Sequence, residues 1–205
     1  MATLSWDAPW LLPFKLLVVL VHEIWHALLT VITGGQVDAL SIAWDGGGET
    51  SVSGLTGLIA FTLSVSAGYV GSMMVGGVLL ASSLHRKRER VVLIAFGIAL
   101  GYFATLYMEP MGLAFNTAAG WAAAFALTSF LPGWFMRFML GSTGTVIVWY
   151  SLYDMFDFAG HIAQTDAGIL ARFLVQEGLG RDADLLSYII SFVWVSIMLA
   201  LLAYT

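Results

Sequence analysis

The chain alternates between long apolar runs and short polar connections. A helix needs about 20 apolar residues to cross a bilayer, and six runs reach or approach that length. They cover residues 10–33, 55–82, 91–108, 111–131, 134–156 and 185–203. The pattern therefore predicts an all-α polytopic membrane protein with about six transmembrane helices.

One polar segment has a different pattern. Residues 36–53 lose the apolar continuity and form two short alternating stretches around Asp45-Gly46-Gly47-Gly48. Alternation with a period of two is typical of a half-exposed strand, and an Asp-Gly pair between two such stretches favours a tight turn. We predict a small β-hairpin directly after the first transmembrane helix.

Glycine and proline mark where the apolar runs end. Gly34-Gly35 follows the first run, Glu109-Pro110 separates the third from the fourth, and Pro132-Gly133 ends the fourth. These residue types terminate helices, because proline lacks a backbone N–H and glycine readily adopts the left-handed conformation of a helix C-terminus. A polar, amphipathic stretch at 157–184 precedes the last run.

The composition agrees with a membrane protein. Of the 205 residues, 60% are hydrophobic and 10% are charged, whereas a soluble domain carries about 25% charged residues. This excludes disordered, collagen-like and disulfide-stapled classes, and the length leaves room for a single membrane domain over 1–205. The second run contains glycines at spacings that permit close helix contact, which we interpret as packing positions. These are Gly68, Gly71, Gly76 and Gly77.

Basic residues give the expected orientation. The net charge is -5, and the basic cluster at 86–90 is too short to indicate nucleic-acid binding. Because Lys and Arg in short loops mark the cytoplasmic side, we expect this loop, and with six alternating spans both termini, to be cytoplasmic. Arg137 agrees, while Arg172 and Arg181 fall on the other side. The first run lacks a small-x-small cleavage site, so we interpret it as a retained span and not as a signal peptide.

The strongest chemical signal lies inside the first run. His22-Glu23-Ile24-Trp25-His26 is an H-E-x-x-H pattern. In a helix the two histidines are about 40° apart around the axis, and Glu23 shares their face. Two imidazoles one turn apart can bind one zinc ion (Zn2+), and the adjacent carboxylate can take a proton from the attacking water. Such groups are costly in a bilayer unless they are paired or bind a metal, so chance is a poor explanation.

A catalytic zinc site requires a third protein ligand. Asp154 and Asp157 stand at the end of the fifth run, where a carboxylate needs a partner. Asp154 follows the apolar residues most directly and is our first choice. Asp157 is the alternative ligand, or a group that orients a ligand.

Three further polar residues are weaker candidates. Asn116, after the break before the fourth run, is a candidate to hydrogen-bond a substrate backbone within the membrane, although an interhelical hydrogen bond explains it equally well. His85 and His161 lie outside the apolar runs and belong to no motif, so we expect them at the surface or the membrane interface.

Taken together, these segments resemble the site-2 proteases, which are intramembrane zinc metallopeptidases, and in particular their compact peptidase-M50B-like branch. The resemblance lies in HEIWHALLTVITGG, the hairpin ending in GGGET, SAGYVGSMMVGGVLL, and SLYDMFDF followed by TDA. It implies a zinc ion held by His22, His26 and an aspartate from a later span, with Glu23 as the base. The better-known members take the third ligand from an L-D-G motif, whereas here Asp154 is followed by Met155.

We therefore predict an intramembrane zinc metalloprotease that hydrolyses peptide bonds of transmembrane proteins or signal-anchor segments within the lipid bilayer, in regulated intramembrane proteolysis. One alternative is a non-enzymatic polytopic membrane protein, a transporter or scaffold with an intramembrane polar or metal-binding cluster. This alternative predicts that Glu23→Gln is tolerated. Another alternative is a membrane zinc enzyme with a different substrate.

Overall fold

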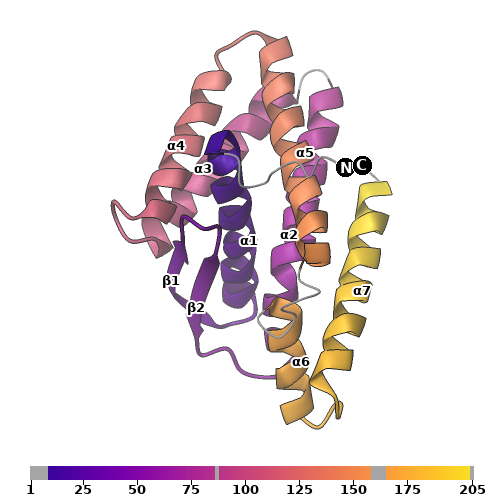
Figure 1. The fold of residues 1–205 in the computed structure, drawn as a ribbon. Coiled ribbons are helices and arrows are strands. Elements are labelled where there is room, and N and C mark those ends of the chain that lie inside the picture. The colour runs from indigo at the N-terminus through magenta and orange to yellow at the C-terminus, as the bar shows by residue number, and fades with distance from the viewer. Residues whose placement is uncertain (1–8, 86–87, 158–164, 204–205) are drawn as a thin grey trace.

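A computed structural model describes residues 9–85, 88–157 and 165–203 of the chain. These residues form a helical bundle with a two-stranded sheet on one side (Figure 1). In chain order the elements are a 3-10 turn Pro9–Leu11, α1 Leu12–Ile32, β1 Gln36–Ile42, β2 Gly48–Ser53, α2 Leu58–Leu84, α3 Glu89–Tyr107, α4 Leu113–Thr128, α5 Gly133–Asp157, α6 Asp166–Gln176 and α7 Ala183–Ala203. The prediction of a mostly helical protein with a small hairpin after the first helix is confirmed.

Four helices of the described residues are long and apolar enough to cross a membrane, namely α1, α2, α3 and α7. Helix α4 is apolar but has only 16 residues, about 24 Å at 1.5 Å per residue, less than the roughly 30 Å hydrocarbon core. Helix α5 has 25 residues, but Arg137, Ser142 and Thr143 interrupt its apolar sequence, and it is not among these four helices. The count of six spans therefore stays a prediction.

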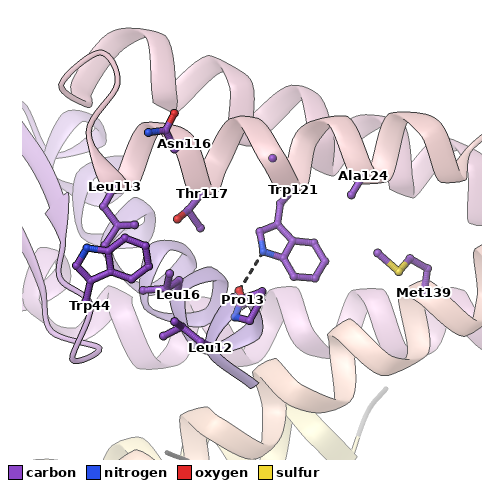
Figure 2. Close-up of a pocket in the computed structure, with 11 residues that line it drawn as sticks. Leu12, Pro13, Leu16, Trp44, Leu113, Asn116, Thr117, Trp121, Ala124 and Met139 are labelled. Carbon is purple, nitrogen blue, oxygen red and sulfur yellow. Dashed lines mark hydrogen bonds between the residues drawn. The ribbon is translucent and has the colours of Figure 1, made fainter. Parts of the chain in front are cut away.

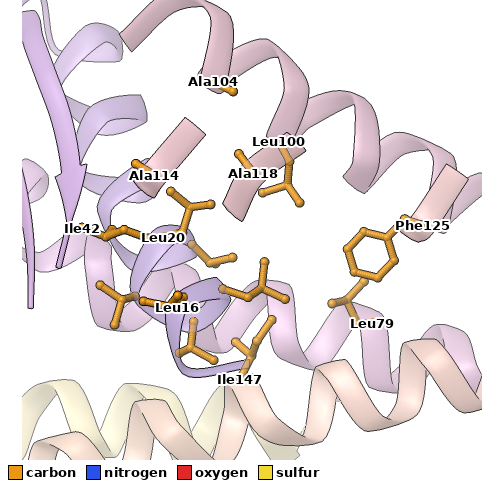
Figure 3. Packing of buried hydrophobic residues seen from close by; sticks show 14 of the residues in the cluster. Leu16, Leu20, Ile42, Leu79, Leu100, Ala104, Ala114, Ala118, Phe125 and Ile147 are labelled. Carbon is orange, nitrogen blue, oxygen red and sulfur yellow. The ribbon is translucent and has the colours of Figure 1, made fainter. Parts of the chain in front are cut away.

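Helix α1 lies at the centre of the main hydrophobic core. Its residues from Leu16 to Val21 are all buried, as expected for a helix that is apolar all round and surrounded by others. The hairpin, α2, α3, α4 and α5 contribute the other side chains of this core, which Figure 3 shows around Leu16 and Leu20. The H-E-x-x-H segment follows directly on this buried stretch, so it is fixed to the most deeply packed part of the bundle.

A second hydrophobic cluster joins α6 and α7 to α2 and α5. Tyr69 and Met73 of α2 pack there with Leu170 of α6 and with Trp194 and Met198 of α7. Figure 1 shows α6 and α7 on the opposite side of α2 from the hairpin. Helix α2 therefore lies between the two hydrophobic clusters.

The glycines of α2 permit two close contacts. A Cβ at Gly71 would collide with the indole of Trp25 on α1, and one at Gly76 would lie 3.0 Å from the backbone nitrogen of Val148 on α5. These positions act as the packing residues that their spacing predicts. Gly68 has a different neighbourhood, described below.

The hairpin packs on α1 in an antiparallel register. Gln36 pairs with Ser53 at its open end, and Ile42 pairs with Gly48 at the turn. Gly46 in the turn has φ +94°, a conformation that favours glycine. Leu40 and Ile42 of β1 are buried in the main core, so the position of β2 relative to α1 is fixed by packing.

Successive long helices run in opposite directions through the bundle. The start of α1, the end of α2, the start of α3 and the end of α7 all lie towards the same end (Figure 1). This arrangement agrees with the alternation on which the predicted orientation depends. The cytoplasmic assignment of that end stays a prediction.

Candidate metal centre

The two histidines of the H-E-x-x-H segment point to one place. His22 Nε2 and His26 Nε2 lie 2.9 Å apart. A carboxylate oxygen of Glu23 and the ring nitrogens lie within 4.8 Å of one another, and Glu23 is only 6% exposed. The three groups therefore lie on one face of α1, as the spacing of the motif predicts.

A third group completes the cluster. Asp166 Oδ2 lies 2.9 Å from His22 Nε2 and 3.2 Å from His26 Nε2. The three side chains are between 12% and 20% exposed. Two nitrogens and one oxygen thus form a nearly equilateral triangle, which we call the ligand triangle.

Asp166 reaches the histidines because α6 begins there. Thr165 caps the helix, its hydroxyl accepting a hydrogen bond from the Gly168 backbone N–H at 3.2 Å. Burial alone raises the pKa of the Asp166 carboxyl, but the charge of His26 and the hydrogen bonds from His22 and His26 outweigh burial and hold this pKa well below its usual range. Asp166 is therefore an ionised carboxylate, the form that a metal ligand must have.

The orientation of His26 is fixed from the other side of the ring. His26 Nδ1 donates a hydrogen bond to the backbone carbonyl of Ser64 on α2 at 2.8 Å. The Ser64 hydroxyl in turn forms a hydrogen bond with the Thr30 hydroxyl, 2.5 Å away. Because the Nδ1 proton is used in this way, the lone pair of His26 Nε2 is free to act as a ligand.

Gly68 of α2 leaves space at the ligand triangle. A Cβ at this position would collide with His22 Nε2 and would lie 2.6 Å from His26 Nε2. The backbone of α2 therefore approaches the triangle closely, and a side chain there would fill the space in front of both imidazoles. This glycine serves the site and not only helix packing.

The ligand triangle fits a zinc ion. Tetrahedral zinc with bonds of 2.0–2.1 Å places its ligands roughly 3.3 Å apart, close to the distances of 2.9, 2.9 and 3.2 Å here. Two imidazoles and one carboxylate form a ligand set that catalytic zinc sites use. A protonated His26 can donate a hydrogen bond to Asp166. When His26 is neutral, its one proton is on Nδ1, so the three converging atoms share at most the single proton of His22, and a cation can take the place of the missing hydrogen bonds.

Asp154, the first sequence candidate for the third ligand, is hydrogen-bonded to a tyrosine. Asp154 Oδ2 accepts a hydrogen bond from the Tyr69 hydroxyl at 2.9 Å. The Tyr69 ring itself packs edge-on against His22, with centroids 4.6 Å apart. Asp157 ends α5, and its side chain lies outside the described part of the structure. Sequence reasoning missed Asp166, although the TDA segment in which it stands belongs to the family resemblance.

Asn116 faces a different part of the molecule. Its Nδ2 donates a hydrogen bond to the Met111 carbonyl at 2.7 Å, and it lines an apolar cavity of about 510 Å³ between α1, α4 and the hairpin turn (Figure 2). None of the ligand-triangle residues lines this cavity, so a role in substrate binding stays a prediction. His85 is exposed, as expected, and His161 lies outside the described residues.

Together, the apolar helices and the ligand triangle define a polytopic membrane protein with a candidate metal centre. A family model described as Peptidase M50B-like matches residues 1–205, the whole chain. The protein belongs to the Peptidase M50B-like family, which confirms the resemblance to site-2 proteases and indicates a membrane metallopeptidase. Comparisons with curated proteins and with solved structures give no match.

Proposed function

We propose that the protein is an intramembrane zinc metallopeptidase in which His22, His26 and Asp166 hold the metal and Glu23 is the general base. The observation that carries the proposal is the convergence of the three ligand atoms on one space beside Glu23. In this proposal Asp166 takes the place that the sequence favoured for Asp154. It does so because Asp166 contacts both imidazoles, whereas Asp154 is bonded to Tyr69.

The chain's own residues would perform the proton transfers. Glu23, buried beside the triangle, is placed to take a proton from the attacking water and to pass it to the leaving amine. The Ser64 carbonyl keeps the His26 ring in one orientation throughout. Bound zinc would supply a Lewis acid that activates the water and polarises the scissile carbonyl.

Membrane-embedded substrates suit the position of the site. The H-E-x-x-H segment lies within α1, a helix that is long and apolar enough to span a bilayer. We therefore propose transmembrane proteins or signal-anchor segments as substrates, in regulated intramembrane proteolysis. A substrate helix must unwind locally before hydrolysis, because its peptide bonds are otherwise sheltered and hydrogen-bonded.

The test compares Glu23→Gln with the parent. Both proteins, purified in detergent and supplied with zinc, are expected to contain about one zinc per chain, while only the parent cleaves a model transmembrane substrate. Glu49→Gln is the matched control, because Glu49 is an exposed glutamate on β2 and its loss changes the net charge equally. A folded parent that takes up no zinc, or a Glu23→Gln variant that cleaves at the parental rate, overturns the proposal. A parent that binds zinc but cleaves none of the model substrates favours the non-enzymatic membrane protein instead.

A further inference from the structure

We propose that strand β2 positions the catalytic base, with Thr50 acting through a hydrogen bond to Glu23 and Gly48 acting through the space it leaves for the carboxylate. The inference rests on the proposed function, since it assigns a role in that same site to the GGGET segment of the hairpin. Thr50 and Gly48 are positioning residues in this proposal, because neither contacts the ligand triangle itself.

Thr50 is bonded to the carboxylate of Glu23. Its Oγ1 donates to Glu23 Oε2 at 2.7 Å and lies 3.1 Å from the Glu23 backbone carbonyl oxygen. The shorter distance is typical of a hydroxyl that donates to an ionised carboxylate. Thr50 pairs with Leu40 of β1, which is 2% exposed in the main core, so the strand that carries the hydroxyl is itself held in place.

Gly48 lies next to Oε1, the other oxygen of the same Glu23 carboxylate. A Cβ at this position would lie 2.5 Å from Glu23 Oε1 and 2.8 Å from Glu23 Cγ. The backbone does not require a glycine here, because the φ of Gly48 is not in the left-handed region. Residues 48 and 50 project to the same face of a strand. The hydroxyl of Thr50 and the bare Cα of Gly48 thus confine the carboxylate from two sides.

Such confinement matters for a general base. A glutamate side chain has three rotatable bonds, and proton transfer requires its oxygen at hydrogen-bond distance from the water. Restricting the carboxylate to one orientation lowers the entropic cost of reaching that geometry. A purely structural role, in which Thr50 only anchors the hairpin to α1, predicts instead that its loss destabilises the fold and leaves catalysis intact in the folded fraction.

The first test changes the hydroxyl of Thr50. We expect Thr50→Val, measured on folded protein with full zinc content, to lower kcat about tenfold with KM unchanged, because a positioned base contributes on the order of 10²–10⁴ to the rate. Thr50→Ser keeps the hydroxyl and should restore most of kcat. Ser53→Ala is the matched control, because this serine on the same strand donates to exposed Asp38 at 3.0 Å and its loss should leave kcat unchanged. Equal kcat values for Thr50→Val and the parent overturn the role of Thr50.

The second test adds a methyl group at Gly48. Gly48→Ala is expected to displace the carboxylate and to lower kcat at least tenfold while zinc content stays at the parental level. The neighbouring Gly47→Ala is the control, since a Cβ there meets only Asp45 Oδ1, at 3.4 Å, and its φ is also outside the left-handed region. Parental kcat in Gly48→Ala overturns the role of Gly48.

A third measurement does not depend on activity. Thr50→Val should lower the midpoint of thermal unfolding in detergent by roughly 3–6 °C in the parent. The shift should be smaller in the Glu23→Ala background, because the carboxylate is absent there and only the longer contact with the backbone carbonyl of residue 23 remains. Equal shifts in both backgrounds mean that the hydroxyl is not hydrogen-bonded to the Glu23 carboxylate, and they overturn the proposal even if the protein cleaves nothing. Unequal shifts in a protein without proteolytic activity would support the hydrogen bond between Thr50 and Glu23 and would contradict only the proposed function.

Discussion

The Tyr69 hydroxyl donates a hydrogen bond to Asp154 at 2.9 Å, while the ring of the same tyrosine lies edge-on against His22. One aspartate therefore contacts the histidine pair directly, and a second is linked to it through Tyr69. Asp166 contacts the imidazole nitrogens directly, and Asp154 holds the side chain that packs against one imidazole. The two carboxylates are separable by mutation.

We expect Asp166→Ala to abolish stoichiometric zinc binding and Asp154→Ala to retain it. The physical reason is that the first substitution removes one of three ligand atoms, whereas the second removes a carboxylate that is hydrogen-bonded to tyrosine side chains. Elemental analysis of the purified proteins measures the difference, with His26→Ala as the reference for a lost ligand. Zinc that is lost with Asp154 and kept with Asp166 would restore the ligand assignment made from the sequence.

The sequence could reveal the histidines but not this aspartate. H-E-x-x-H fixes its own geometry, because one helical turn sets the separation of His22 and His26. Asp166 lies 144 residues from His22, and in the sequence it reads as an acidic residue in the first turn of an amphipathic helix capped by Thr165, which is favourable without any metal. Only the packing of α6 against α2 shows that this helix begins at the histidines.

Gly68→Ala should weaken zinc binding without unfolding the protein. The added methyl group would occupy the space in front of His22 Nε2 and His26 Nε2. Gly101→Ala is the matched control, a helix glycine of α3 whose Cβ would meet no atom within 4 Å. Zinc titration of the metal-free proteins compares the two variants. Parental zinc affinity in Gly68→Ala would contradict the position we assign to the metal.

The contact between α2 and α5 is expected to tolerate no added atom at Gly144. A Cβ there would lie 2.7 Å from the Gly76 carbonyl oxygen and 2.7 Å from the Leu80 backbone nitrogen, and backbone atoms cannot move aside as a side chain can. We expect Gly144→Ala to cost about 1–3 kcal/mol of stability, the usual range for overpacking.

The unfolding midpoint in detergent measures this cost. Gly141→Ala, one turn away on α5, is the control, because its Cβ would meet only the Ser83 side chain, at 3.3 Å. If both variants unfold at the same temperature, the close approach of α2 and α5 at Gly144 is wrong.

Cysteine labelling can decide the orientation, because the chain contains no cysteine. We expect His85→Cys, at the end of α2, to react with a membrane-impermeant thiol reagent only in inside-out vesicles. Glu177→Cys, after α6, should react only in right-side-out vesicles. Both positions are exposed, and helices α2 and α6, which they follow, end at opposite ends of the bundle (Figure 1). The reverse labelling pattern would place the basic loop outside the cytoplasm.

The hairpin shows both the strength and the limit of sequence patterns. Alternation and the Asp45-Gly46 turn predict two strands in their observed place, because strand period and turn chemistry are local properties. The bond from Thr50 to Glu23 joins two segments 27 residues apart and depends on how the hairpin docks on α1. No periodicity carries that information, so the contact emerges only from the three-dimensional structure.

Asp166 lies outside the main core, so a metal ion bound by it and by the two histidines would connect the two hydrophobic clusters. His22 and His26 follow the buried stretch of α1, whereas Asp166 belongs to α6, whose apolar side chains pack in the second cluster with α7. A zinc ion bound by all three would therefore hold α6 and α7 against α1 more tightly than side-chain packing alone does. Removing it with a chelator should therefore loosen α6 and α7 first, and hydrogen exchange in these two helices would report the state of the metal centre.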